Sequence, residues 1–228
     1  MAKGSSGIAG GTSGNAKAEI VVQSGDKVML DSPLIYGQKD QAVTGNVRTA
    51  IEAQETKRLT AKSEYGLMLD KYGNPVGSEV HGGKGSVRMP YGVFLTKGGI
   101  FTHNHPCGKG EEGVLGGTFS PADMKTFAKN PTWTMRASAA EGTYSITKTL
   151  SFDSAGFNSY VSKINSAATS ALNKANTDLL NNVRMGNVAY SDYTQKAKNN
   201  FNNFLVEVHN GMLAGQKQYG YNYTLEER

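Results

Sequence analysis

The spacing of apolar residues changes near Leu150, and this change limits the folds open to the chain. Before that point, short apolar runs such as Tyr65–Leu69 are separated by turns rich in Gly and Pro, a pattern typical of β-strands. After it, residues 153–185 and 190–215 carry apolar side chains at helical spacing. The sequence therefore predicts an α+β fold with a mixed β-sheet, followed by two helices.

This change divides the chain into three segments. Residues 1–17 are rich in Gly and Ser and hold few apolar side chains to bury, so we expect a disordered tail. Residues 18–150 should form the α+β domain. Residues 151–228 should form a helical C-terminal region that packs on this domain or on a partner protein.

Composition excludes several classes of protein. One cysteine in 228 residues cannot support a disulfide scaffold or a Cys-rich zinc finger. No apolar run approaches the length of a membrane-spanning helix, and the N-terminus lacks an apolar signal core. We therefore expect a protein of a reducing, cytoplasmic compartment without a membrane partner.

The charge of the chain is a weak indication of its partners. Lys and Arg number 24 against 19 Asp and Glu, which gives a formal charge of +5. The positive residues are scattered, however, and form no basic block or arginine-rich helix face. A nucleic-acid partner is therefore not favoured.

Within the domain, several elements can be placed by pattern. A helix is expected at 43–62, with Val47, Ala50, Ile51 and Leu59 on one side. Further extended segments are expected at 76–80, 86–90, 91–95, 100–105, 133–139 and 143–148, the last two forming a hairpin that turns at Glu141–Gly142.

The stretch His103-Asn104-His105-Pro106 carries the strongest chemical signal. In a strand, residues i and i+2 face the same side, so both imidazoles point into one space. Two imidazoles at a strand end can act as a pair of metal ligands.

A second motif, Ser120-Pro121-Ala122-Asp123, predicts the start of a helix that ends before Pro131. Ser120 suits the N-cap, and Pro121 suits the first helical position because its missing N–H costs nothing there. Asp123 then lies in the first turn and can supply an oxygen ligand. Two His and one Asp leave a fourth position open, which is typical of a catalytic zinc site.

Each motif alone also has a simpler interpretation. A lone His-x-His is more often two surface imidazoles, and Ser-Pro-Ala-Asp is most simply a helix cap. Capping and metal binding are compatible, because the cap holds the carboxylate that would bind the metal. Cys107 is most simply a small buried or loop thiol, with a fourth ligand or a redox sensor as alternatives.

Hydrolysis at such a site also needs a proton acceptor. Glu64 directly precedes the apolar run 65–69 and would lie beside the metal if that strand pairs with the His strand. The alternative carboxylates are Glu79, Glu52 and Glu55. The hydroxyl of Ser120 could donate to a developing oxyanion.

This combination resembles the JAB/MPN-type (JAMM) zinc metalloproteases, in which a Glu precedes an apolar strand and His-x-His-Pro and Ser-x-x-Asp follow. The motif sequences His-Asn-His-Pro and Ser-Pro-Ala-Asp are most similar to those of the RadC-like and phage-associated prokaryotic branch. The resemblance implies zinc bound by His103, His105 and Asp123, Glu64 as general base and Ser120 as oxyanion donor. It also implies a curved β-sheet flanked by helices.

The resemblance covers about residues 43–148, and the chain departs from the family motif in two places. The separation of 18 positions between His105 and Asp123 is longer than in the motif, because of a Gly-rich insertion at 107–118 that could form a flap. Between Glu64 and His103, no amphipathic helix is evident, although the family usually has one there.

Three functions follow from these observations. The first is hydrolysis of peptide or isopeptide bonds in a protein substrate, as in the family, often beside a ubiquitin-like or flexible tail. The second is a structural, head-associated protein of a phage or mobile element, which could be part of the virion. Its domain would be weakly active or inactive, and its C-terminal helices would bind a partner. The third is a RadC-like, nucleic-acid-associated role.

Overall fold

The computed structural model describes residues 19–21, 27–43, 45–106 and 113–227. The tail expected at 1–17, Cys107 and the first half of the 107–118 insertion lie outside the described residues.

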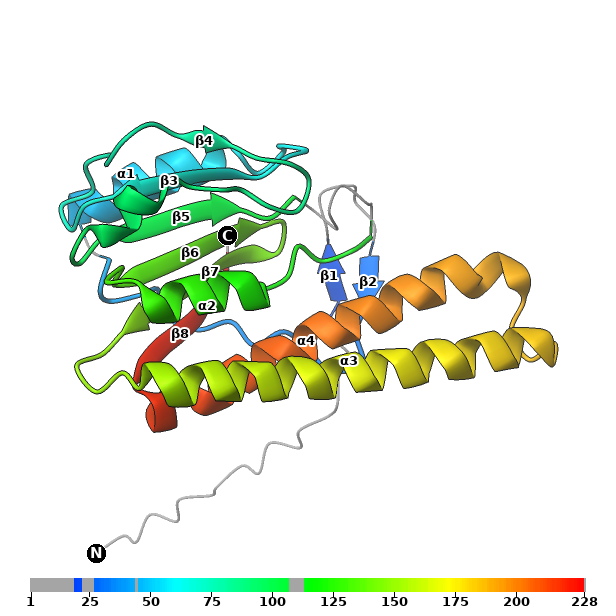
Figure 1. Cartoon of the computed structure of the whole chain (residues 1–228). Coiled ribbons are helices and arrows are strands. Elements are labelled where there is room, and N and C mark those ends of the chain that lie inside the picture. The colour runs from blue at the N-terminus through cyan, green and yellow to red at the C-terminus, as the bar shows by residue number, and fades with distance from the viewer. Residues whose placement is uncertain (1–18, 22–26, 44, 107–112, 228) are drawn as a thin grey trace, which may run out of the picture.

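A six-stranded mixed sheet with the strand order β4-β3-β5-β6-β7-β8 forms the centre of the fold (Figure 1). Its strands are β3 (Tyr65–Leu69), β4 (Val80–His81), β5 (Ile100–Asn104), β6 (Thr134–Ala139), β7 (Gly142–Lys148) and β8 (Tyr221–Glu226). Neighbouring strands are antiparallel except β5 and β6, which are parallel. A separate antiparallel pair consists of β1 (Glu19–Val21) and β2 (Lys27–Met29). The predicted α+β class with a mixed sheet is confirmed.

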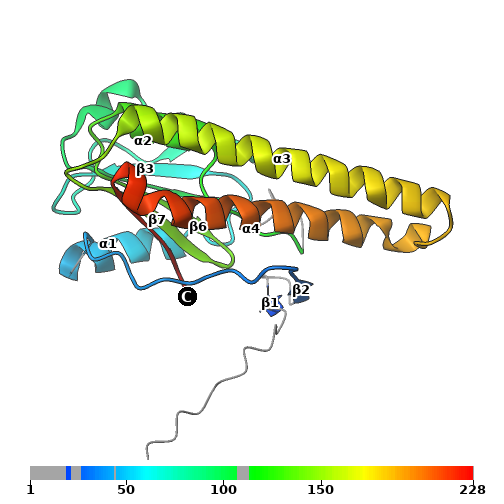
Figure 2. The same cartoon turned by 90° about the horizontal axis from the view of Figure 1, so that it is seen from below.

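Helices cover both faces of this sheet (Figures 1 and 2). The helix α1 (Gly45–Thr56) lies on one face, and the opposite face is covered by α2 (Pro121–Lys129), α3 (Ser154–Arg184) and α4 (Tyr193–Tyr219). Parallel neighbours need a crossover, and α2 provides it between β5 and β6. The crossover brings the start of α2 to the edge of the sheet where β5 ends.

The face beneath α2, α3 and α4 forms the main apolar core. Phe101, Met135, Ile146 and Tyr223 follow one another across four neighbouring strands, and each is almost completely buried. Apolar side chains from the three helices pack on this row, which fixes the helices against the sheet.

The opposite face is polar at its centre. Arg136 on β6 is buried, and its guanidinium donates to Glu55 of α1 at 2.8 Å and to Glu226 of β8 at 3.1 Å. Arg48 of α1 also donates to Glu226 at 3.0 Å. Burial disfavours the charged form of Glu226, but Arg136 outweighs that effect and lowers the pKa of this carboxyl group. Charged groups thus tie α1 and the last strand to the middle of the sheet.

The C-terminal region consists of a long helical hairpin and a returning strand. The two helices expected at 153–185 and 190–215 are present as α3 and α4, and the Asp153 side chain caps α3 by accepting from the amides of Ala155 and Gly156. Gly220 ends α4 in the left-handed conformation, which favours glycine. The helical region assigned to 151–228 therefore also contains β8, which joins the sheet beside β7.

Two local predictions differ from the structure. The segment 91–95 is a 3-10 helix, η1, and not a strand, and 86–90 forms no strand. The helix expected at 43–62 ends at Thr56. The chain then makes tight turns, one of which is closed by a hydrogen bond from the Arg58 amide to the Glu55 carbonyl. Short apolar runs look alike in strands and in packed turns, so periodicity alone did not distinguish them.

The prediction of which residues form the buried face of α1 is also partly wrong. Ile51 is buried and Val47 packs beside it, but Ala50 is exposed. Glu55 is buried instead, because Arg136 compensates its charge.

None of the helices in the described part of the chain combines the length and apolar character needed to cross a lipid bilayer.

Loss of the Arg136 charge should destabilise the fold strongly. The variant Arg136→Met leaves Glu55 buried without a compensating charge and removes one of the two arginines that pair with Glu226, so the free energy of unfolding should fall by about 3–5 kcal/mol. Urea denaturation followed by circular dichroism measures this change. The control is Arg184→Met at the exposed end of α3, and equal midpoints for the two variants would contradict the prediction.

Candidate metal centre

The end of β5 places two histidines on one side of the sheet. His103 is the fourth residue of the strand and almost completely buried, and its ring stacks on Phe101 with centroids 5.0 Å apart. His105 follows the strand, where its amide still donates to the carbonyl of Ser138 at 2.7 Å. Strand geometry therefore continues through both residues and turns both rings to the same side.

The start of α2 brings Asp123 to these rings. Ser120 is the N-cap, its hydroxyl accepts from the Asp123 amide at 3.2 Å, and Asp123 Oδ2 accepts from the Ser120 amide at 2.9 Å. This reciprocal capping box confirms the helix start expected from the sequence. It also fixes the direction in which the Asp123 carboxylate points.

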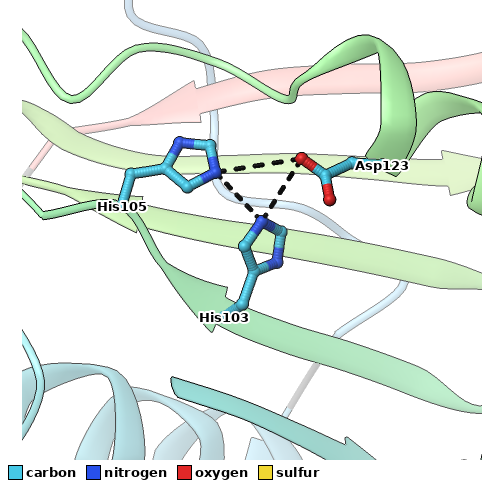
Figure 3. Close-up of side chains that lie close together, drawn as sticks. All are labelled: His103, His105 and Asp123. Carbon is cyan, nitrogen blue, oxygen red and sulfur yellow. Dashed lines mark hydrogen bonds and ion pairs between the residues drawn. The ribbon is translucent and has the colours of Figure 1, made fainter. Parts of the chain in front are cut away.

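Three ligand atoms converge between these elements (Figure 3). The Nε2 atoms of His103 and His105 lie 3.0 Å apart, and Asp123 Oδ2 lies 3.7 Å and 3.9 Å from them. A circle through three points at these distances has a radius of about 2.1 Å, which matches the distances of about 2.0–2.2 Å at which His nitrogen and carboxylate oxygen bind zinc. The three residues could therefore hold one metal ion, and their separations are close to those required around zinc.

The second nitrogen of each ring is buried in the fold. His105 Nδ1 lies 3.0 Å from the carbonyl of Gly117, so it carries the proton and leaves Nε2 free to bind a metal. His103 Nδ1 faces the backbone of Arg136 and makes no hydrogen bond of normal geometry among the described residues.

The charges and burial of His103, His105 and Asp123 favour a single proton among the three side chains, bound to His103. Burial disfavours the charged form of His103, but the Asp123 carboxylate outweighs it and raises the pKa of His103. Burial and the neighbouring charge of His103 lower the pKa of His105 to about 4. Burial opposes ionisation of Asp123, but the charge on His103 overcomes this and lowers its pKa. The proton on His103 thus occupies the space in which a cation would bind.

The predicted base, Glu64, borders the same site. It precedes β3, and its amide donates to the Gly83 carbonyl at 2.8 Å. Its side chain is mostly buried, and its charge contributes to the raised pKa of His103. Glu64, His105 and Asp123 line one cavity of about 480 Å³. The structure therefore brings Glu64 together with the three candidate ligands.

Ser120 also lines this cavity, but its hydroxyl proton is already engaged. The hydroxyl donates to Asp123 Oδ2 at 2.7 Å and thereby orients the carboxylate. Its role as an oxyanion donor stays a prediction.

The alternative carboxylates lie in other ion pairs. Glu79 pairs with Arg58, and Glu52 pairs with Lys39 at 3.2 Å. Glu55 binds Arg136 on the opposite face of the sheet. Of these four carboxylates, Glu64 is therefore the one that adjoins the candidate ligands.

Two residues that shape the site were not identified from the sequence. Glu141, at the β6–β7 turn, is buried, and its carboxylate accepts from the amides of Gly116 at 3.1 Å and Gly117 at 2.8 Å. Asn202 of α4 is buried and accepts from the Leu115 amide at 2.9 Å. Both hold the segment whose Gly117 carbonyl orients His105. Neither has a local sequence signal, because the partners lie far apart in the chain.

Comparison of the chain with protein-family models, with curated proteins and with solved structures found no match. The resemblance to JAMM enzymes consequently depends on the motif residues themselves.

Zinc should bind at about one ion per chain with an affinity that depends on pH. Since the metal displaces the proton of His103, affinity should rise by up to about tenfold per pH unit below the pKa of that residue. Competition with a chromogenic chelator between pH 6 and pH 8 measures this change. The double variant His103→Ala/His105→Ala should lose the zinc, whereas His81→Ala, at an exposed histidine, should keep it. Equal zinc content in both variants would disprove the site.

Glu141→Gln should weaken zinc binding although Glu141 does not contact the metal ligands. An amide group would turn an NH₂ toward one of the two backbone N–H donors, loosen the segment at 116–117 and release His105 from its orientation. We expect a loss of about tenfold in zinc affinity, typical for groups that orient a ligand. The exposed Glu207→Gln is the control, and unchanged affinity in Glu141→Gln would show that this carboxylate does not position the site.

Proposed function

We propose that the protein is a zinc-dependent hydrolase of peptide or isopeptide bonds, with chemistry similar to that of the JAMM metalloproteases. The observation that carries this proposal is the convergence of His103, His105 and Asp123 at a cavity that Glu64 also lines. A zinc ion held by these ligands would supply Lewis-acid chemistry, which polarises a carbonyl group and acidifies water.

In this proposal, Glu64 transfers protons. Its carboxylate takes a proton from the attacking water and later returns it to the leaving amine. Its low exposure and its position in the cavity support this role, since a base must lie within hydrogen-bond reach of the water. The neighbouring histidines cannot substitute for it while they bind the metal.

Ser120 has two tasks in the proposal. Its amide holds Asp123 Oδ2 at 2.9 Å independently of its hydroxyl. The hydroxyl can therefore rotate from Asp123 toward a developing oxyanion while the carboxylate stays oriented.

The depth of the site favours a flexible substrate. The side chains of His103 and His105 are only 1% and 11% exposed. An extended peptide or a protein tail can reach such atoms, whereas a folded surface cannot. The proposed substrate is therefore a protein with a flexible tail, such as a ubiquitin-like one, in the reducing cytoplasm that the single cysteine suggests.

A structural role in a phage or mobile element is the second candidate function. The α3–α4 hairpin extends beyond the sheet (Figures 1 and 2) and exposes Leu180, Met185 and Tyr190 near its tip. These side chains could contact a partner protein. Zinc binding without any cleavage by the parent protein would favour this candidate.

The variant Glu64→Gln separates the two functions. It should keep about one zinc per chain and cleave at least about 100-fold more slowly, because general-base catalysis contributes about 10²–10⁴-fold. The probe is a proteome-derived peptide library incubated with zinc-loaded protein and analysed by mass spectrometry. Glu79→Gln, which alters a carboxylate outside the site, should cleave like the parent. Equal rates for the parent and Glu64→Gln would exclude Glu64 as the base.

A further inference from the structure

The cavity that holds the candidate metal ligands has a second wall, formed by α4. Phe201, Phe204, Leu205 and Val208 line the cavity together with Asp123. The rings of Phe201 and Phe204 are stacked with centroids 5.7 Å apart, and both are only partly buried. An aromatic surface therefore remains open inside the cavity.

This wall is held close to the metal ligands through Gly117. A Cβ atom at Gly117 would lie 2.7 Å from Leu205 Cδ2, so the glycine and the leucine are in direct contact. The Gly117 carbonyl in turn lies 3.0 Å from His105 Nδ1. Only one residue thus separates Leu205 from a candidate ligand.

Asn202 fixes the wall relative to this segment. Its side chain accepts from the Leu115 amide at 2.9 Å and donates to the Gly113 carbonyl at 3.1 Å. It is fully buried and lies on α4 between Phe201 and Leu205. The wall is therefore a fixed part of the cavity.

The charges of the cavity select against charged substrate side chains. Among the described lining residues, the ionisable ones are Glu64, His105 and Asp123, all at the metal end. A charged group at the α4 wall would lose its water without gaining an ionic partner from the described lining residues of that wall, whereas an apolar group would release water from the Phe rings. A volume of about 480 Å³ is also large enough for a few peptide residues.

We propose that Phe201, Phe204 and Leu205 form a subsite that binds a large apolar or aromatic side chain of the peptide substrate next to the bond that is cleaved. This inference rests on the proposed zinc hydrolase function and adds the class of substrate. It assigns the C-terminal helices to the active site as a specificity wall.

Two small metal-binding compounds test the subsite without a known substrate. N-acetyl-phenylalanine hydroxamate and N-acetylglycine hydroxamate share the zinc-binding group and differ in the side chain. Calorimetry with the zinc-loaded full chain measures both dissociation constants. The phenylalanine compound should bind at least about tenfold more tightly, as expected for burial of an aromatic side chain.

The double variant Phe201→Ala/Leu205→Ala should remove this preference, so that the two compounds bind with nearly equal affinity. Leu213→Ala is the matched control, since it shortens a partly buried leucine on the same helix that packs on the core outside the cavity. Because each ratio is measured within one protein, a change in stability does not affect it.

The outcomes separate the two proposals. The preference is the ratio of the two dissociation constants. A ratio near one in the parent protein, or a ratio in the double variant equal to that of the parent, would overturn the subsite alone. Absence of zinc, or failure of both compounds to bind the zinc-loaded protein, would contradict the proposed function and the subsite with it.

Discussion

The buried charge of Arg136 is the constraint on which the arrangement of the sheet depends. Its guanidinium compensates Glu55 from α1 and Glu226 from the last strand, and no two of these residues are near one another in sequence. A buried charge must be compensated, so the ion pairs join these three elements around Arg136. The amide of Asp40 also donates to Glu226 at 2.8 Å, which attaches the segment before α1 to the same centre.

With β6 fixed in this way, the two faces of the sheet carry different groups of residues. Arg136 points toward α1, while its neighbour Ala137 faces the other side and pairs in register with His103. The charged cluster and the candidate metal centre therefore lie on opposite faces of the same strands. The metal side carries the main apolar core, and this low-polarity surrounding strengthens the interaction between the histidines and Asp123.

Much of the fold could be predicted because its signals are local. The Ser120–Asp123 capping box, the β6–β7 hairpin and the two long helices each depend on residues close together in the chain. The predictions that were wrong concern elements determined by distant contacts. The buried face of α1 includes a glutamate because of Arg136, and the segment 91–95 packs as a 3-10 helix although its apolar run suggested a strand.

The sequence by itself determined the ligand types of the candidate site, because strand alternation and helix capping dictate where His103, His105 and Asp123 point. Only the tertiary structure decided that their three atoms meet closely enough to hold one metal ion, since this requires the parallel pairing of β5 and β6 and the crossover through α2. It also decided that Glu141 and Asn202 support the site and that α4 forms a wall of its cavity. These contacts join residues that are 24 to 87 positions apart, and no local pattern encodes a contact of that kind.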